Sequence, residues 1–266
     1  MKHLEAGLAQ HQRPRQAQHR APLAVFCALL LVSYCYVWPQ FRTSSVRIDD
    51  VIYVGHHNPA LKQTTYLGIP YANPPVDGLR FKPPTPYVPD PAVLAKIRKA
   101  DAFGPSCPQS TPVPYDISED CLTANVWVPH VSKQLRNSLG DEIERGLPVL
   151  VWIYGGAFIN GSTQKYPAHD LVEASIRLAS LFPGPFLVYL TSIQGKPTIV
   201  ASFNYRLGMF GFPIGVDSDT SNTRNLGLLD QRLALEWIHA NIARFGGDPN
   251  KASIFPFLSA FSYTSG

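Results

Sequence analysis

The chain has 266 residues, of which 45% are hydrophobic and 16% charged, so it can bury a sizeable core in one or two domains. Its net charge of +4 owes much to a basic N-terminal tail, and Lys and Arg are scattered beyond it, which argues against a nucleic-acid-binding surface. The four cysteines do not have the spacing of a zinc site.

The N-terminus contains a candidate membrane segment. Residues 1–20 are polar and basic and are expected to form a disordered tail. Residues 21–38 are uncharged and mainly apolar, a length at the low edge for a spanning helix and slightly long for a signal-peptide core. Aromatic residues such as Tyr36 and Trp38 stand where a cleavage site needs small ones, which favours an uncleaved signal anchor over a cleaved signal peptide. The basic residues before the segment place the globular part in the lumen or outside the cell.

The next part of the chain predicts strands and one exposed connection. Val46–Tyr71 has the pattern of short strands and turns, Leu122–Val128 predicts another strand, and Ser132–Gly146 a charged loop or partial helix. Cys107 and Cys121 flank a loop rich in Pro and Ser. In an oxidising compartment a disulfide commonly closes such a loop, and two free thiols are the alternative.

The segment Val149–Ile153 is an apolar run without alternation, typical of a strand buried on both faces. It stops at Gly155-Gly156, where the backbone can adopt positive φ and turn its N–H groups outward. Such donors can stabilise a developing oxyanion, although a plain glycine turn is the other reading. The sequon Asn160-Gly-Ser162 follows, and its position beside this loop argues against its glycosylation.

Residues 168–178 have the apolar spacing of an amphipathic helix, and Ile199–Phe203 predicts a second buried strand. Residues 179–195 between them far exceed the usual helix-to-strand connection of about 2–6 residues. We interpret this segment as an insertion or a gene-model error, such as a translated intron, with a lipid-facing flap as the alternative. His169-Asp170 is no base-and-acid pair, because adjacent helical residues do not face each other.

The last predicted helix begins within Asn222–Asn225 and ends at Gly246-Gly247. Its apolar residues fall on one face, with charged residues elsewhere. Lys251–Phe255 predicts the next strand.

Motifs in a fixed order give the chain a specific resemblance. They are Tyr66-Leu-Gly-Ile-Pro-Tyr-Ala-Asn-Pro-Pro75, Leu79-Arg-Phe81, Ser118-Glu-Asp-Cys-Leu-Thr-Ala-Asn-Val-Trp127, the Gly155-Gly156 segment, Phe203-Asn-Tyr-Arg-Leu-Gly208, Asn225-Leu-Gly-Leu-Leu-Asp-Gln231 and Asn241-Ile-Ala-Arg-Phe-Gly-Gly-Asp-Pro249. Over about residues 46–255 this series resembles the type-B carboxylesterases, which include cholinesterases and fungal secreted lipases. The resemblance implies an α/β-hydrolase fold in residues 46–266: a mostly parallel central sheet with an N-terminal β region, truncated after the nucleophile strand.

The resemblance also implies an activity. Family members hydrolyse carboxylic esters through an acyl-serine intermediate, so the expected substrate is a small-molecule or lipid ester, and no metal or cofactor is implied. Gly155, Gly156 and Ala157 match the oxyanion loop, with the N–H groups of Gly156 and Ala157 as donors.

Structural roles carry over in the same way. The resemblance implies a disulfide between Cys107 and Cys121. Two ion pairs are expected to be structural rather than catalytic, namely Arg80 with Glu119 and Arg206 with Asp230.

The chain departs from the family pattern after Phe255. The family has a Gly-x-Ser-x-Gly elbow there, but this chain has Pro256-Phe-Leu-Ser-Ala-Phe261, with Ser259 one position late. All eight histidines precede Ser259, although the acid and histidine follow the serine in this fold. We therefore expect the chain as written to be inactive. The alternative is a non-catalytic cholinesterase-like binding or adhesion domain, which would explain both a membrane anchor and a missing nucleophile.

Overall fold

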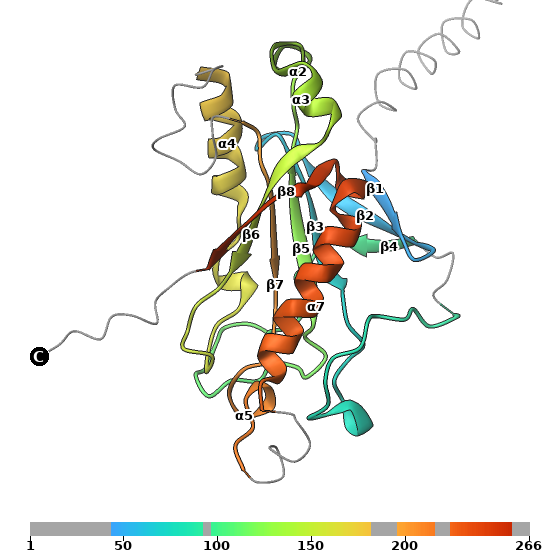
Figure 1. Cartoon of the computed structure of the whole chain (residues 1–266), viewed down its shortest axis with the longest axis vertical. Coiled ribbons are helices and arrows are strands. Elements are labelled where there is room, and N and C mark those ends of the chain that lie inside the picture. The colour runs from blue at the N-terminus through green and yellow to red at the C-terminus, as the bar shows by residue number, and fades with distance from the viewer. Residues whose placement is uncertain (1–43, 93–96, 182–195, 216–223, 257–266) are drawn as a thin grey trace, which may run out of the picture. The chain divides into compact units, whose positions relative to one another are not determined.

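The computed structural model describes residues 44–92, 97–181, 196–215 and 224–256 (Figure 1). The predicted tail, the candidate membrane segment at 21–38, residues 182–195 and Ser259 lie outside the described residues. Across the described ranges, no helix is both long enough and apolar enough to cross a membrane.

One mixed sheet forms the centre of the described chain (Figure 1). Its strands follow the order β1-β2-β3-β5-β7-β6-β8, and β4 pairs with β2 off this path. The strands are β1 (Ser45–Ile48), β2 (Val51–Asn58), β3 (Gln63–Pro70), β4 (Ile97–Ala100), β5 (Thr123–Pro129), β6 (Leu147–Ile153), β7 (Ile199–Phe203) and β8 (Gly247–Pro256).

The two halves of the sheet differ in strand direction. β6 is parallel to β7 and β8, with Val151 opposite Ala201 on one side and Ile254 on the other. From β7 through β5, β3 and β2 to β1, every neighbouring pair is antiparallel. Along this path the predicted parallel arrangement is therefore confined to β7, β6 and β8, and off the path β4 lies parallel to β2. A short turn such as Asp49-Asp50 is enough to join antiparallel neighbours, whereas parallel neighbours need a long crossover.

The helices and helical turns are α2 (Lys133–Leu139), α3 (Asp141–Glu144), α4 (His169–Leu181), α5 (Gly208–Gly211), α7 (Leu226–Asn241), η2 (Asp77–Leu79), η3 (Thr163–Lys165) and η5 (Ile242–Phe245). The partial helix predicted within Ser132–Gly146 corresponds to α2 and α3.

Two helix ends differ from the prediction. α4 continues to Leu181, so the first residues assigned to the insertion at 179–195 are helical. α7 ends at Asn241, because the chain tightens into η5 before Gly246 ends it with a left-handed conformation.

The longest helices, α4 and α7, cover opposite faces of the sheet. Val172 of α4 is buried in a cluster with Leu150 of β6. Ile238 of α7 belongs to another cluster, together with Val149 and Val151 of the same strand. Because successive residues of a strand point to opposite faces, this alternation places one helix on each side of β6.

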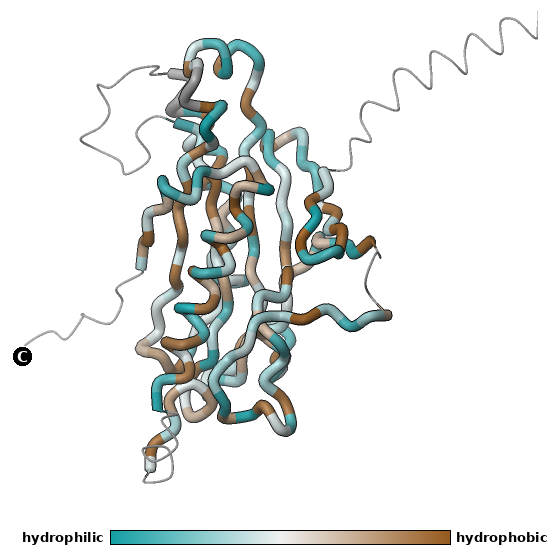
Figure 2. The backbone as a smooth tube through the Cα atoms, turned by 45° about the vertical axis from the view of Figure 1, so that its right-hand side comes forward, coloured by the Kyte–Doolittle hydropathy of each residue, from teal (hydrophilic) through white to brown (hydrophobic). Residues whose placement is uncertain are grey.

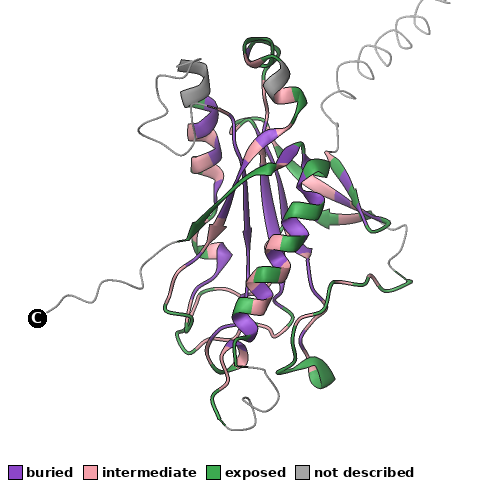
Figure 3. Cartoon of the chain, viewed as in Figure 1, coloured by how far each residue is buried: buried purple, intermediate pink, exposed green. Residues whose placement is uncertain are grey.

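Hydrophobic residues recur along the central strands (Figure 2), and these strands are largely buried (Figure 3). β8 is the exception, since most of its residues beyond Asp248 are exposed. Ile254 and Phe255 are 53% and 46% exposed, and within the described chain β8 pairs only with β6. This edge presents apolar side chains and an unpaired backbone, a combination that favours association.

Candidate active site

The segment after the carboxyl end of β6 forms a tight loop. φ is +134° at Gly156, +52° at Ala157 and +61° at Phe158. The sequence predicted positive φ at Gly155 and Gly156, but Gly155 lies outside this region and the turn continues into two residues that carry Cβ atoms. Left-handed conformations at non-glycine residues cost of order 1–3 kcal/mol each, so neighbouring groups must hold this loop.

The loop closes on itself over Gly156. The Gly156 carbonyl accepts hydrogen bonds from the amides of Ile159 at 3.0 Å and Asn160 at 3.2 Å. A Cβ atom at position 156 would lie 2.0 Å from the carbonyl oxygen of Asn160. Only glycine fits here, because the approach of the backbone leaves no room for a side chain.

The loop presents two N–H donors. The amides of Gly156 and Ala157 have no acceptor among the described residues. On the other side of the turn, the Phe158 carbonyl accepts from the Gly208 amide at 2.7 Å, which ties the loop to the start of α5. Two adjacent, preorganised N–H groups at the end of a buried strand can stabilise an oxyanion.

Two stacked tyrosines join the residue before the loop to the segment after β7. Tyr154 and Tyr205 have ring centroids 4.6 Å apart with planes 14° from parallel. The Tyr205 hydroxyl donates to the Tyr154 carbonyl at 2.9 Å, and the Tyr205 amide donates to the Tyr154 hydroxyl at 3.2 Å. Burial raises the pKa of both phenols above the ordinary value, so both hydroxyls remain protonated donors.

Asn204, the neighbour of Tyr205 in the chain, binds three other segments. Its side-chain oxygen accepts from the Thr163 amide and hydroxyl, each at 3.1 Å. Its side-chain nitrogen donates to the Pro105 carbonyl at 3.0 Å, and its own carbonyl accepts from the Tyr71 hydroxyl at 2.7 Å. Sequence reasoning quoted Asn204 and Tyr205 as motif residues but assigned them no role. Their position directly after a buried apolar strand was the available signal.

The predicted disulfide between Cys107 and Cys121 is confirmed, and both cysteines are fully buried. The loop that it closes contacts Gly161, just after the turn at Gly156. Gln109 bonds the backbone of Gly161 on both sides, accepting from its amide at 2.9 Å and donating to its carbonyl at 3.0 Å. The disulfide loop therefore braces the chain a few residues beyond the N–H donors.

The four residues of the predicted ion pairs lie in two different environments. Arg206 donates through Nε and Nη2 to the two carboxylate oxygens of Asp230, at 2.8 and 2.7 Å, and the two side chains are 4% and 0% exposed. Burial raises the pKa of Asp230, and the bonds from Arg206 oppose that effect. Arg80 and Glu119 form a 2.6 Å pair at the surface.

The described histidines make no hydrogen bond to the loop. His57 stacks on His130 with ring centroids 4.4 Å apart. His130 follows β5, whose last residues lie beside the start of β7, whereas the loop lies at the opposite ends of the parallel strands. His57 and His130 therefore lie toward the other end of the strands from this loop.

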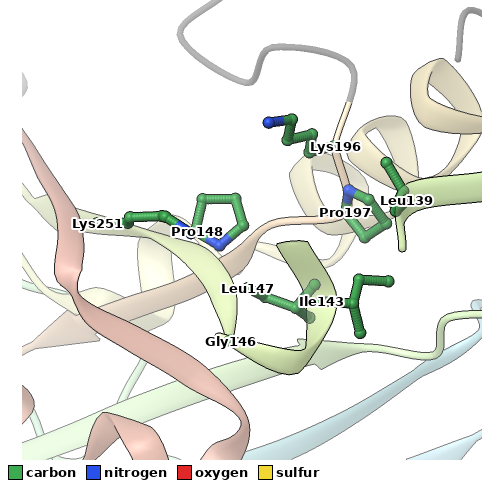
Figure 4. Close-up of a pocket in the computed structure, with 8 residues that line it drawn as sticks. All are labelled: Leu139, Ile143, Gly146, Leu147, Pro148, Lys196, Pro197 and Lys251. Carbon is green, nitrogen blue, oxygen red and sulfur yellow. The ribbon is translucent and has the colours of Figure 1, made fainter. Parts of the chain in front are cut away.

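A hollow lies at the start of β6, at the end opposite the Gly156 loop (Figure 4). It measures about 110 Å³ and is lined by Leu139, Ile143, Gly146, Leu147, Pro148, Lys196, Pro197 and Lys251. Gly146–Pro148 precede or begin β6, while the N–H donors follow its end. This hollow is therefore separate from the loop at Gly156.

Sheet order, the two covering helices and the donor loop after a parallel strand define an α/β-hydrolase fold. Solved esterases share this architecture. Aspergillus niger EstA superposes with a TM-score of 0.61 at 29% identity, covering 80% of this chain and 35% of that protein. A pNB esterase superposes with a TM-score of 0.61 at 35% identity, covering 80% of this chain and 38% of the esterase.

The sequence comparisons give the family. The carboxylesterase family model matches residues 52–256, and the chain belongs to that family. Lipase 4 of Diutina rugosa is 37% identical over 219 residues, which is 74% of this chain and 35% of the lipase. A carboxylic ester hydrolase of Bombus ignitus is 37% identical over 245 residues, covering 88% of this chain and 37% of the hydrolase. The chain thus spans little more than a third of the length of these relatives.

Proposed function

We propose that this chain carries the oxyanion-binding part of a serine carboxylic ester hydrolase, with Gly156 and Ala157 as the backbone donors. The observation that carries the proposal is the pair of N–H groups after β6, held at positive φ, for which the described residues supply no acceptor. β8 ends beside this loop, with Pro256 opposite Ile153. In the family the nucleophile follows this strand, so an ester carbonyl there would lie near both donors. Small-molecule or lipid esters are the proposed substrates.

We further propose that the 266-residue chain does not itself hydrolyse esters. An oxyanion hole acts on a tetrahedral intermediate, and no acyl-enzyme intermediate forms without an activated nucleophile. Pro256 and Phe257 do not suit a sharp strand-to-helix turn, and no histidine follows Ser259 in the sequence.

The test is turnover of a short-chain activated ester by the purified chain and by Ser259→Ala. We expect background rates from both proteins. Activity that disappears in the variant would overturn the proposal and identify Ser259 as an unusual nucleophile. Activity that both proteins share would equally contradict an inactive chain. The control is an oxyanion-loop variant purified in parallel: if it shows the same rate, the activity comes from a contaminating esterase.

A binding or adhesion domain is the second candidate function, and the sequence after Phe255 favours it because the Gly-x-Ser-x-Gly elbow is missing. Sequencing the transcript distinguishes the two candidates. An in-frame elbow coding segment behind a splice site supports an esterase, whereas its absence together with a complete C-terminal half supports the binding domain.

For location, we propose that residues 46–266 are lumenal or extracellular. The disulfide supports an oxidising compartment, and one relative is a secreted lipase of Botryotinia fuckeliana. We propose that residues 21–38 act as a membrane anchor. Protease treatment of microsomes should leave an uncleaved, protected chain with its anchor, and a released, shortened product would show a cleaved signal instead.

A further inference from the structure

The sequence contains a single Asn-x-Ser/Thr sequon, at Asn160-Gly161-Ser162. Its place directly after the oxyanion loop argued against glycosylation when the sequence was considered alone. The orientation of the Asn160 amide changes that assessment, because its two ends face different surroundings.

The oxygen end of the amide faces the oxyanion loop. Asn160 Oδ1 lies 2.5 Å from the position that a Cβ atom at Gly156 would occupy. The nitrogen end faces the disulfide loop, where Nδ2 lies 3.5 Å from Thr111 Oγ1 at the surface. A substituent on Nδ2 is therefore directed toward the disulfide loop rather than toward Gly156.

The Asn160 nitrogen is available for substitution. A distance of 3.5 Å is long for an N–H···O hydrogen bond, which is usually 2.7–3.2 Å, so little free energy holds Nδ2 to Thr111. Substitution removes only one of its two N–H groups, and the other can still face Thr111.

A hollow of about 290 Å³ lies next to the Asn160 amide. Its lining includes Thr111, Pro112 and Tyr115 of the disulfide loop together with Asn160 and Lys165. Its size is near the lower end for small-ligand pockets, enough for one sugar but not for an oligosaccharide. Tyr115 supplies an aromatic ring and Pro112 an apolar ring for the faces of a sugar.

We propose that Asn160 is N-glycosylated and that the first sugar occupies this hollow between the disulfide loop and the oxyanion segment. The donor is a polyprenyl-diphosphate-linked oligosaccharide. The bond between the anomeric carbon and the diphosphate oxygen breaks, and the diphosphate leaves with the electron pair. A new bond joins that carbon to Asn160 Nδ2, which releases one proton. The proposal rests on the lumenal location proposed above.

The test is translation of the full chain with endoplasmic-reticulum microsomes, followed by treatment with an amidase that removes N-glycans. The wild type should lose the mass of one glycan, and Asn160→Gln should show no glycan. Ser162→Thr preserves the sequon and should remain glycosylated. Asp116→Asn creates a second sequon with Ser118 at an exposed position of the disulfide loop and should add a second glycan.

The Asp116→Asn variant separates the possible failures. One glycan in this variant, still present when Asn160→Gln is added, means that the chain is lumenal but Asn160 is not used, which overturns the proposal. No glycan in any variant overturns both the proposal and the lumenal location. Two glycans in Asp116→Asn, reduced to one by Asn160→Gln, support both.

A second measurement tests where the first sugar lies. An endoglycosidase that leaves one sugar on Asn160 gives a form to compare with the complete glycoform and with Asn160→Gln. If that sugar fills the hollow, the trimmed form should unfold at the same temperature as the complete glycoform and above Asn160→Gln. A trimmed form no more stable than Asn160→Gln would show that the sugar lies outside the hollow.

Discussion

Tyr154 and Tyr205 are bound to each other's backbone. The Tyr205 hydroxyl donates to the Tyr154 carbonyl at 2.9 Å, and the Tyr154 hydroxyl accepts from the Tyr205 amide at 3.2 Å. Tyr154 directly precedes Gly155, and Tyr205 directly follows Asn204. The pair therefore joins the start of the oxyanion loop to the segment that follows β7.

Removing the Tyr205 hydroxyl should loosen this junction. Tyr205→Phe leaves the buried Tyr154 carbonyl without this donor, and we expect a loss of about 1–3 kcal/mol in the free energy of unfolding. Urea unfolding of the purified chain measures it. Tyr115→Phe is the matched control, because no described residue bonds the Tyr115 hydroxyl, and it should change stability little. Equal losses in the two variants would contradict a special role for Tyr205.

The two ion pairs should differ in their contribution to stability. Asp230→Asn leaves the buried Arg206 guanidinium without its counter-charge, a change that costs about 3–5 kcal/mol. Glu119→Gln affects a solvent-exposed pair and should cost much less. Chemical denaturation of both variants gives the comparison. A small loss in Asp230→Asn would show that the buried pair does not organise this region.

Stability should fall as the pH drops below about 6.5. Burial, followed by the neighbouring His57, lowers the pKa of His130 from 6.5, so in this range the unfolded chain binds more protons at this site than the folded chain. Stability rises with pH wherever the unfolded state binds more protons, and the effect of this group disappears above its unfolded pKa.

The measurement is the urea midpoint at about pH 7.5 and pH 5.5, between which the unfolded histidine gains its proton. His130→Gln should reduce the difference. Some dependence should persist, because burial also lowers the pKa of His169. An unchanged difference in His130→Gln would remove His130 as its source.

Loss of the disulfide should destabilise the described domain. Cys107 and Cys121 are 14 positions apart, and a loop of this size contributes about 3 kcal/mol in the chain-entropy model. We expect the Cys107→Ser, Cys121→Ser double variant to unfold at lower urea concentration than the oxidised chain. The reduced wild type should behave like the variant. If the oxidised and reduced chains have the same midpoint, the disulfide does not stabilise the fold.

Residues 182–194 should be dispensable. The Thr198 amide donates to Ser175 Oγ at 3.1 Å, so the entrance to β7 already lies against α4. Leu181 is six helical residues beyond Ser175, a rise of about 9 Å, which the remaining residues 195–197 and their flanking bonds can span. Deleting residues 182–194 should maintain thermal stability and raise soluble yield. A lower unfolding temperature would identify the segment as a packed part of the protein.

Much of this protein could be read directly from its sequence. Val149–Ile153 is apolar without interruption and Ile199–Phe203 is apolar except for Ser202, so both form largely buried strands. The amphipathic spacing marked α4, and the motif order indicated the carboxylesterase family and its α/β-hydrolase fold. These features depend on residue type and local spacing, which the sequence contains in full.

Tertiary structure decided the rest. Positive φ falls on Ala157 and Phe158 rather than on Gly155, because hydrogen bonds from residues farther along close the turn at Gly156. The Tyr154–Tyr205 pair joins residues 51 positions apart, and it exists only because β6 and β7 are parallel neighbours. The Asn160 amide gains distinct surroundings at its two ends only when the disulfide loop packs beside the oxyanion loop. Local patterns contain no record of such neighbours, since strand order and loop packing bring distant segments together.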